Sequence, residues 1–333
     1  MKKFLRNDPH VRPIGILAAC ILLLTLADWG QGRFLSMATA FSTFEIFATV
    51  GPVALGLGLT MMIHEFDLSV IGTFSMAGCI AVLTGAQHPW AGIIFALAAG
   101  LAAGIVQGFI IVRLRLGSIG VTLGGLLVLA GGASVLTENR TIPYGNMLVA
   151  LDLAAKLTGV FSIRSLVALA LFIAAAVIMA VTRVGRDVVA IGSDRRAAMI
   201  AGVNVDGQIV GIFAFSGVCA ALSGALLSYS LASASVVGIS VIIVPATAAA
   251  ILGGVSLSGG TGRPLGIAVG VLILAVLSTG FNAVGALPYA NDVAMGAILT
   301  VVAMLDGPHL MHHLSWRSRQ HAAPPPDRAN WQV

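Results

Sequence analysis

The chain has 333 residues, of which 58% are hydrophobic and only 9% charged, and its formal net charge is +5. A soluble domain usually carries about 25% charged residues, because its surface must face water. The composition therefore excludes an ordinary soluble enzyme and indicates a protein whose surface mostly faces lipid.

Apolar segments of membrane-spanning length recur along the chain. A transmembrane helix needs about 20 apolar residues, and open strands cannot satisfy their backbone in lipid. Only Asp28 and Asp292 interrupt these segments. We therefore expect an all-α polytopic membrane protein with about ten transmembrane helices. The segments are residues 13–29, 46–63, 68–84, 89–112, 116–137, 165–182, 208–231, 238–256, 265–284 and 287–305. The 40 glycines suit close packing of such helices.

Basic residues gather on one side of the predicted membrane. If the N-terminus is cytoplasmic and the helices alternate, 14 of the 18 lysines and arginines fall in cytoplasmic segments, as the positive-inside rule requires. Both termini are then cytoplasmic. The expected parts are a basic N-terminus at 1–12, a membrane domain at 13–306 with a cytoplasmic loop at 183–207 and an external loop at 138–164, and a cytoplasmic tail at 307–333.

The first apolar segment resembles a signal peptide, and residues 17–20 resemble a lipoprotein cleavage box. Because apolar residues continue past Cys20 to Leu26, a retained first helix is favoured over cleavage. Cys20, Cys79 and Cys219 lie inside apolar segments and are expected to be small buried hydrophobes, since their spacing suits neither a metal nor a disulfide framework.

A short charged segment separates the second and third apolar segments. It contains His64, Glu65 and Asp67, and charges so close to hydrocarbon are costly unless they face a cavity, a partner or the interface. Two interpretations remain open. One is a tight cytoplasmic turn in which Asp67 caps a helix beginning at Leu68. The other is a broken-helix element beside a transport pathway.

The external segment at 138–164 contains a second amphipathic stretch. Residues 148–157 alternate at helical spacing, with Asp152 and Lys156 four residues apart. We expect a helix at the membrane interface. It either receives an external ligand carrier or is a simple connector.

The longest internal cytoplasmic loop, at 183–205, is charged. Residues 194–201 are expected to form a short helix, capped by Ser193 or Asp194 and ended by Gly202. Such a helix beneath a membrane bundle suits docking to a soluble partner. The alternative is a solvated connector.

Motifs of soluble enzymes have weaker support. The glycine-rich stretch at 253–262 lacks the lysine and preceding strand of a phosphate-binding loop. Ser258 as a protease nucleophile would need a His or Lys base at membrane depth, and the predicted spans contain none. The C-terminal tail has histidines beside arginines, which favours contact with anionic lipid over a metal site.

Four stretches form an ordered set of motifs. They are Phe-Asp-Leu-Ser-Val-Ile-Gly at 66–72, Gln-Gly-Phe-Ile-Ile-Val-Arg-Leu-Arg-Leu at 107–116 followed by Val-Thr-Leu-Gly at 121–124, Ala-Ile-Gly at 190–192 with Arg-Ala-Ala-Met-Ile-Ala-Gly-Val at 196–203, and Ile-Leu-Gly-Gly-Val-Ser-Leu-Ser-Gly-Gly-Thr-Gly at 251–262. Together they resemble the permease subunits of bacterial ATP-binding-cassette (ABC) importers for ribose and other monosaccharides, within the branched-chain-amino-acid/ribose permease superfamily, a group that also contains autoinducer-2 permeases.

The chain departs from that family at a few positions. Arg196 stands where Glu is usual and Gln107 where Asn is usual, Gly117–Ser118 replace a common Pro, and His64–Glu65 precede Asp67 where the family is usually uncharged. These departures concern ATPase docking and solute choice. They also suit an atypical subunit that pairs with a different permease.

The resemblance implies a permease subunit of the bacterial inner membrane that is not an enzyme and needs no cofactor, because ATP is bound by partner subunits. The implied partners are a second permease, identical or homologous, two cytoplasmic ATPase subunits, a periplasmic solute-binding protein and membrane lipid, with no role for nucleic acid. The implied ATPase-coupling residues are Gly192, Asp194, Arg195, Arg196, Ala197, Ala198 and Gly202, and the glycine signature is Gly253, Gly254, Gly259, Gly260 and Gly262.

A polar seam is expected to pass the solute. Its candidates are Asp67, Ser69, Gln107, Thr122 and Asn282, joined by Ser134, Thr137, Ser216, Ser223, Thr247, Ser278 and Thr279. Hydroxyl and amide groups suit a hydroxyl-rich solute, since both sides can donate and accept hydrogen bonds. Hydrogen bonding between helices is the alternative role for each.

Two other functions remain open. An ion-coupled secondary transporter would need a carboxylate or His within the membrane, and only Glu45, Glu65 and Asp67 lie near enough, all at segment ends. A membrane scaffold that transports nothing is the other. The sequence leaves the solute open among pentoses, hexoses, polyols, inositol and furanosyl ligands.

Overall fold

The computed structural model describes residues 11–30, 32–236 and 242–287, and within 288–300 it describes 289–291, 293–294, 296–297 and 300. The predicted tail lies outside these residues, and the predicted tenth span at 287–305 lies mostly outside them. Within the described residues the fold is all-α, as expected, apart from a pair of two-residue strands, β1 (Ile142–Pro143) and β2 (Ser233–Ala234).

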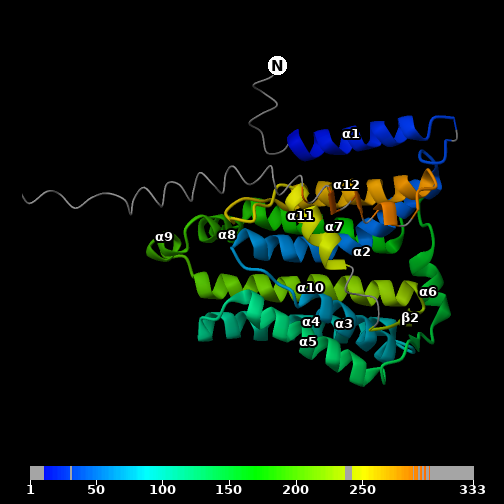
Figure 1. The fold of residues 1–333 in the computed structure, drawn as a ribbon. Coiled ribbons are helices and arrows are strands. Elements are labelled where there is room, and N and C mark those ends of the chain that lie inside the picture. Colours follow the sequence, from blue (N-terminus) through cyan, green and yellow to red (C-terminus); the bar gives the residue numbers. More distant parts are fainter. Residues whose placement is uncertain are drawn as a thin grey trace, which may run out of the picture.

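Within the described residues, nine apolar helices form a bundle, and most of the long ones run along its length (Figure 1). Six are long and apolar enough to cross a membrane, which agrees with the predicted multi-pass protein. They are α2 (Met37–Met62), α4 (Pro89–Leu114), α5 (Ser118–Leu136), α7 (Ile163–Val181), α10 (Val205–Ser230) and α12 (Pro264–Ala283). The three shorter ones are α1 (Val11–Ala27), α3 (Val70–Thr84) and α11 (Ile243–Leu252).

Small helices mark the two ends of the bundle (Figure 1). We call the end with α8 (Arg183–Ser193) and α9 (Arg195–Ile200) the α9 end, which the charge distribution predicts to be cytoplasmic. The opposite end, with α6 (Met147–Ala154) and the β1–β2 pair, is the α6 end.

Close backbone contacts hold α10 against its neighbours. A Cβ atom added at Gly104 of α4 would meet the carbonyl oxygen of Phe213, and one added at Gly224 of α10 would meet that of Phe74 in α3. At Gly56 of α2 it would lie 2.8 Å from the Cα of Ser216. Such approaches allow dispersion contacts that replace the hydrophobic effect between helices in lipid.

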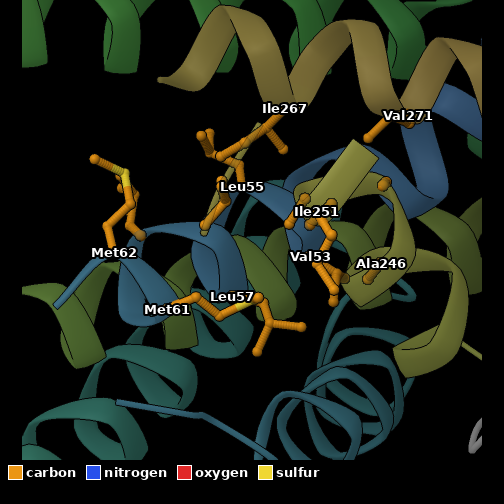
Figure 2. Packing of buried hydrophobic residues seen from close by; sticks show 14 of the residues in the cluster. Val53, Leu55, Leu57, Met61, Met62, Ala246, Ile251, Ile267 and Val271 are labelled. Atoms are coloured by element: carbon orange, nitrogen blue, oxygen red, sulfur yellow. The ribbon is translucent and has the colours of Figure 1, made fainter. Parts of the chain in front are cut away.

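The apolar core lies where α2 meets α11 and α12 (Figure 2). Val53, Leu55 and Leu57 of α2 are completely buried, and Ile267 of α12 and Ala246 of α11 pack with them. An apolar helix that is buried around its circumference belongs to the interior of a bundle, so α2 is a central helix.

The helices differ from the prediction in three places. Helix α2 begins nine residues before the predicted segment, because Ser36 caps it by accepting a hydrogen bond from the Thr39 N–H at 3.2 Å. Helix α8 was not predicted within the 183–205 loop. The described part of the predicted 238–256 span contains only the ten-residue α11, which rises about 15 Å and so covers about half of the hydrocarbon thickness.

The helix expected at 148–157 is α6, which ends at Ala154. The expected Asp152–Lys156 pair is wrong: the Lys156 ammonium lies 5.1 Å from the centre of the Phe41 ring, beyond the end of the helix. Leu148 and Leu151 are exposed, as in a helix lying at a membrane interface.

Candidate functional site

Helix α9 projects at the α9 end as a short, well-capped helix. Asp194, and not Ser193, is its cap, since its Oδ1 accepts hydrogen bonds from the backbone N–H groups of Arg196 at 2.8 Å and Ala197 at 3.0 Å. Gly202 ends the helix with a φ of +84°, the left-handed conformation that glycine adopts without strain. The short helix predicted from the sequence is confirmed.

The outer face of α9 is open to solvent. Ala198 is buried, but the side chains of Met199 and Ile200 are 52% and 89% exposed beside Arg195 and Arg196. Adjacent exposed apolar and cationic side chains at the water-facing end of a membrane bundle suit contact with a soluble protein.

Two of the sequence motifs meet at the end of α2. The Gly260 N–H donates a hydrogen bond to the Met62 carbonyl at 2.9 Å, and Gly192 of α8 packs against the same carbonyl. A Cβ at Gly192 would collide with both the Met62 oxygen and the Gly260 nitrogen. The glycine signature therefore forms a joint with α8 and α2.

Left-handed backbone makes glycine necessary in this joint. Gly254, Gly259 and Gly260 have φ values of +88°, +70° and +74°, which L side chains rarely adopt. Gly253 and Gly262 pack against Gly266 and Met62 respectively. The loop turns the chain from α11 into α12 in close contact with other backbone.

The charged segment between α2 and α3, residues 63–69, is held from several sides; we call it the α2–α3 connector. Asp67 is 1% exposed. Its Oδ1 accepts hydrogen bonds from the Ser69 N–H at 3.0 Å and the Ser69 hydroxyl at 2.5 Å, and its Oδ2 accepts one from Ser216 of α10 at 2.7 Å. Helix α3 begins at Val70, so the predicted cap of a helix starting at Leu68 is wrong.

Helix α5 holds the connector from another direction. The N–H groups of Phe66 and Leu68 donate to Ser118 at 3.0 Å and to Thr122 at 3.1 Å. Three of the predicted pathway residues, Asp67, Ser69 and Thr122, are therefore brought together with Ser216. Asp67 and Ser69 of the connector are buried, whereas His64 is exposed. The broken-helix element beside a transport pathway stays a prediction.

The other two predicted pathway residues lie elsewhere. Gln107 of α4 packs against Gly125 of α5, and Asn282 is exposed in the last turn of α12, at the α6 end. Several seam hydroxyls bond to backbone carbonyls within their own helices, as Ser134 does to Ala130 at 3.0 Å, and Ser223 bonds to the Thr49 carbonyl of α2 at 2.6 Å. The Ser223 bond joins α10 to α2, whereas the bonds within a helix satisfy the hydroxyl groups locally.

Three of the five glycines of α5 have no close neighbour within the described chain, whereas Gly125 packs against Gln107 and Gly132 lies near Met76. A Cβ at Gly120, Gly124 or Gly131 would have nothing within 4 Å. Beside them, a groove of about 600 Å³ between α4 and α5 is lined by Gln107 among other residues. Gln107 is 5% exposed, and its carbonyl oxygen has no hydrogen-bond partner in the described part of the chain. We call this surface the α5 glycine face.

Sequence analysis missed a buried ion pair towards the α6 end. Arg164 of α7 is 5% exposed and donates to Glu45 of α2 at 2.7 Å, to Ser230 of α10 at 2.9 Å and to Thr49 at 2.6 Å. Ser162 also bonds to Glu45. The predicted segments 46–63 and 165–182 leave both charges just outside the spans, whereas each lies inside a helix. The sequence signal for the pair is that two opposite charges flank two predicted spans on the same side of the membrane.

Comparison with known proteins gives consistent matches over most of the chain. The model of the family described as branched-chain amino acid transport system / permease component matches residues 37–303. The chain is 27% identical over 300 residues to the ribose import permease protein RbsC of Escherichia coli K12, covering 87% of this chain and 92% of that protein.

Two further relatives are named as permeases for other sugars. The fructose import permease protein FrcC of Rhizobium meliloti is 27% identical over 323 residues, covering 92% of this chain and 87% of that protein. The L-arabinose transport system permease protein AraH of Escherichia coli K12 is 29% identical over 298 residues, covering 87% of this chain and 86% of that protein. No solved structure matches.

The buried ion pair makes a testable prediction about stability. Arg164→Met leaves Glu45 without its cation, and removing one partner of a buried pair costs about 3–5 kcal/mol. The double variant E45Q/R164M leaves no isolated charge and is expected to unfold closer to the wild-type temperature. Thermal unfolding of the three purified proteins in one detergent measures this. A double variant as unstable as R164M would contradict it.

Proposed function

The chain belongs to the family of permease components of branched-chain amino acid transport systems, and from this membership we propose that it is the membrane-spanning subunit of an ABC importer for a monosaccharide or similar polyhydroxylated solute. The observation that carries the proposal is the exposed helix α9, placed where a soluble motor can reach it and joined through Gly192 to the end of α2. Sugar import by the named relatives supports the solute class.

The proposed complex divides the work between subunits. Two cytoplasmic ATPase subunits bind ATP and dock on α9, so this chain needs no nucleotide site or cofactor of its own. A periplasmic solute-binding protein delivers the sugar at the α6 end, where α6 presents exposed leucines. The assembly lies in the bacterial cytoplasmic membrane.

Closure of the ATPases would displace α9 and change access to the pathway. Gly192, Gly260 and the Met62 carbonyl are packed without room for a Cβ atom, and such tight packing transmits displacement instead of absorbing it. Movement of α8 and α9 would therefore reach α2, the buried central helix.

The α5 glycine face is where we place a second copy of the chain. Most glycines of α2, α3, α4, α10 and α12 meet a neighbouring helix closely, as Gly104 does at Phe213, although Gly211 of α10 does not. Lipid does not need such small residues, whereas a crossing helix does.

Uptake with a controlled energy source tests the function. Vesicles containing the permease with its ATPase and solute-binding protein should accumulate labelled ribose, arabinose or fructose, and vanadate should abolish accumulation because it blocks ATP hydrolysis by the motor. Uptake that persists with vanadate but collapses with an uncoupler at constant ATP would support the ion-coupled alternative and refute the proposal.

Docking at α9 can be tested with one backbone substitution. Gly202→Pro imposes a φ near −65° where the chain needs +84°, and it should distort α9 and abolish co-purification of the ATPase while membrane insertion persists. Gly159→Pro is the matched control, since Gly159 also has a positive φ, of +57°, but lies at the α6 end. ATPase retained by G202P would refute docking at α9.

Oxidative cross-linking locates the second copy. In a chain with Cys20, Cys79 and Cys219 replaced by Ala, single cysteines at Gly120, Gly124 or Gly131 should form disulfide-linked dimers in native membranes. Ile173, Val177 and Val181 of α7 are equally exposed and provide control positions. Dimers linked at α7 and not at α5 would refute this placement.

A further inference from the structure

Glu65 joins α9 to the α2–α3 connector through an ion pair. The Arg195 Nη1 lies 3.0 Å from the Glu65 Oε1. The Glu65 side chain is 10% exposed and that of Arg195 is 44% exposed. The pair therefore connects a solvent-exposed helix to a buried part of the bundle across 130 residues of sequence.

Local structure fixes the Glu65 end of this link. The His64 N–H donates to the Met61 carbonyl at 3.1 Å and the Glu65 N–H to the Thr60 carbonyl at 3.0 Å, which is the Schellman pattern that ends a helix. His64 takes the left-handed position with a φ of +64°, and its imidazole packs on Gly259. Glu65 is thus held at the last turn of α2.

Only Phe66 lies between Glu65 and Asp67, so their Cα atoms are at most about 7 Å apart. Asp67 binds Ser216 of α10 and Ser69 at the start of α3, and its neighbours Phe66 and Leu68 bind α5. A displacement of Glu65 therefore acts on a segment that is bonded to three membrane helices and has almost no slack.

We propose that the Glu65–Arg195 ion pair is a transmission link, through which movement of α9 reaches the α2–α3 connector and thereby α3, α5 and α10. Both are positioning residues. The link complements the glycine joint, which reaches α2. The inference deepens the proposed function and rests on it, because α9 has a motor to respond to only in an ABC importer.

Paired substitutions test the link in the full complex. E65Q, R195Q, E65Q/R195Q and the charge swap E65R/R195E are compared with R113Q. Arg113, in the last turn of α4, is the matched control, since it is an exposed arginine outside α9 and forms no ion pair within the described chain. Permease and ATPase are reconstituted in proteoliposomes with the binding protein, and ATP hydrolysis is measured together with uptake of whichever of ribose, arabinose and fructose the wild type accumulates.

We expect E65Q and R195Q each to lower the sugar imported per ATP hydrolysed about fivefold. The double variant should lose no more of the sugar-to-ATP ratio than either single variant, because the effects of substitutions at two contacting residues are not additive. The charge swap should recover most of that ratio. Additive losses, an equal loss in R113Q, or uptake and hydrolysis falling in proportion would overturn the link.

Amide hydrogen exchange in the permease alone gives a readout independent of transport. R195Q, but not R113Q, should speed exchange at residues 66–69, because the connector loses one of its anchors. Unchanged exchange there would overturn the link even if R195Q lowers the sugar imported per ATP. A wild-type chain that never binds an ATPase would instead refute the proposed function, while the exchange result would stand.

Discussion

Backbone-to-backbone contact at glycine is the constraint on which this structure depends. Lipid removes the hydrophobic driving force between helices, so association relies on dispersion and hydrogen bonds that need close approach. Gly104, Gly56 and Gly224 provide that approach around α10. The same device extends beyond the membrane helices, because Gly192 and Gly260 bring α8 and the glycine loop against the Met62 carbonyl.

Buried charges are the second determinant, and each of the main ones has partners. Arg164 meets Glu45 together with three hydroxyl groups around the pair, and Asp67 accepts three hydrogen bonds. A charge in a low-dielectric interior is tolerated only with such compensation. As a result, the polar groups that interrupt the apolar sequence become fixed connections between helices distant in the chain.

These connections converge on the end of α2. The glycine joint contacts the Met62 carbonyl itself, the α2–α3 connector begins at the next residue, and Arg195 binds Glu65 of that connector. A motor acting on α9 would therefore act on one small region that is bonded to α2, α3, α5, α8 and α10. The rigid joint and the ion pair give that region two routes to the membrane helices, one made of backbone and one of charge.

Composition and periodicity by themselves determined the all-α membrane fold, the approximate spans and the short helix α9, because burial in lipid and helix capping are local properties of the sequence. Asp194 and Gly202 flank α9 as expected, and the motif resemblance gave the transport family that comparison with known proteins confirmed. The roles of the individual site residues stay predictions.

Only the tertiary structure decided which distant groups meet. The pairing of Glu65 with Arg195 and of Glu45 with Arg164 could not be read from the chain. A charge at the edge of an apolar segment looks the same in sequence whether it faces water or a buried partner. Its actual environment depends on helices more than 100 residues away, brought into contact by packing.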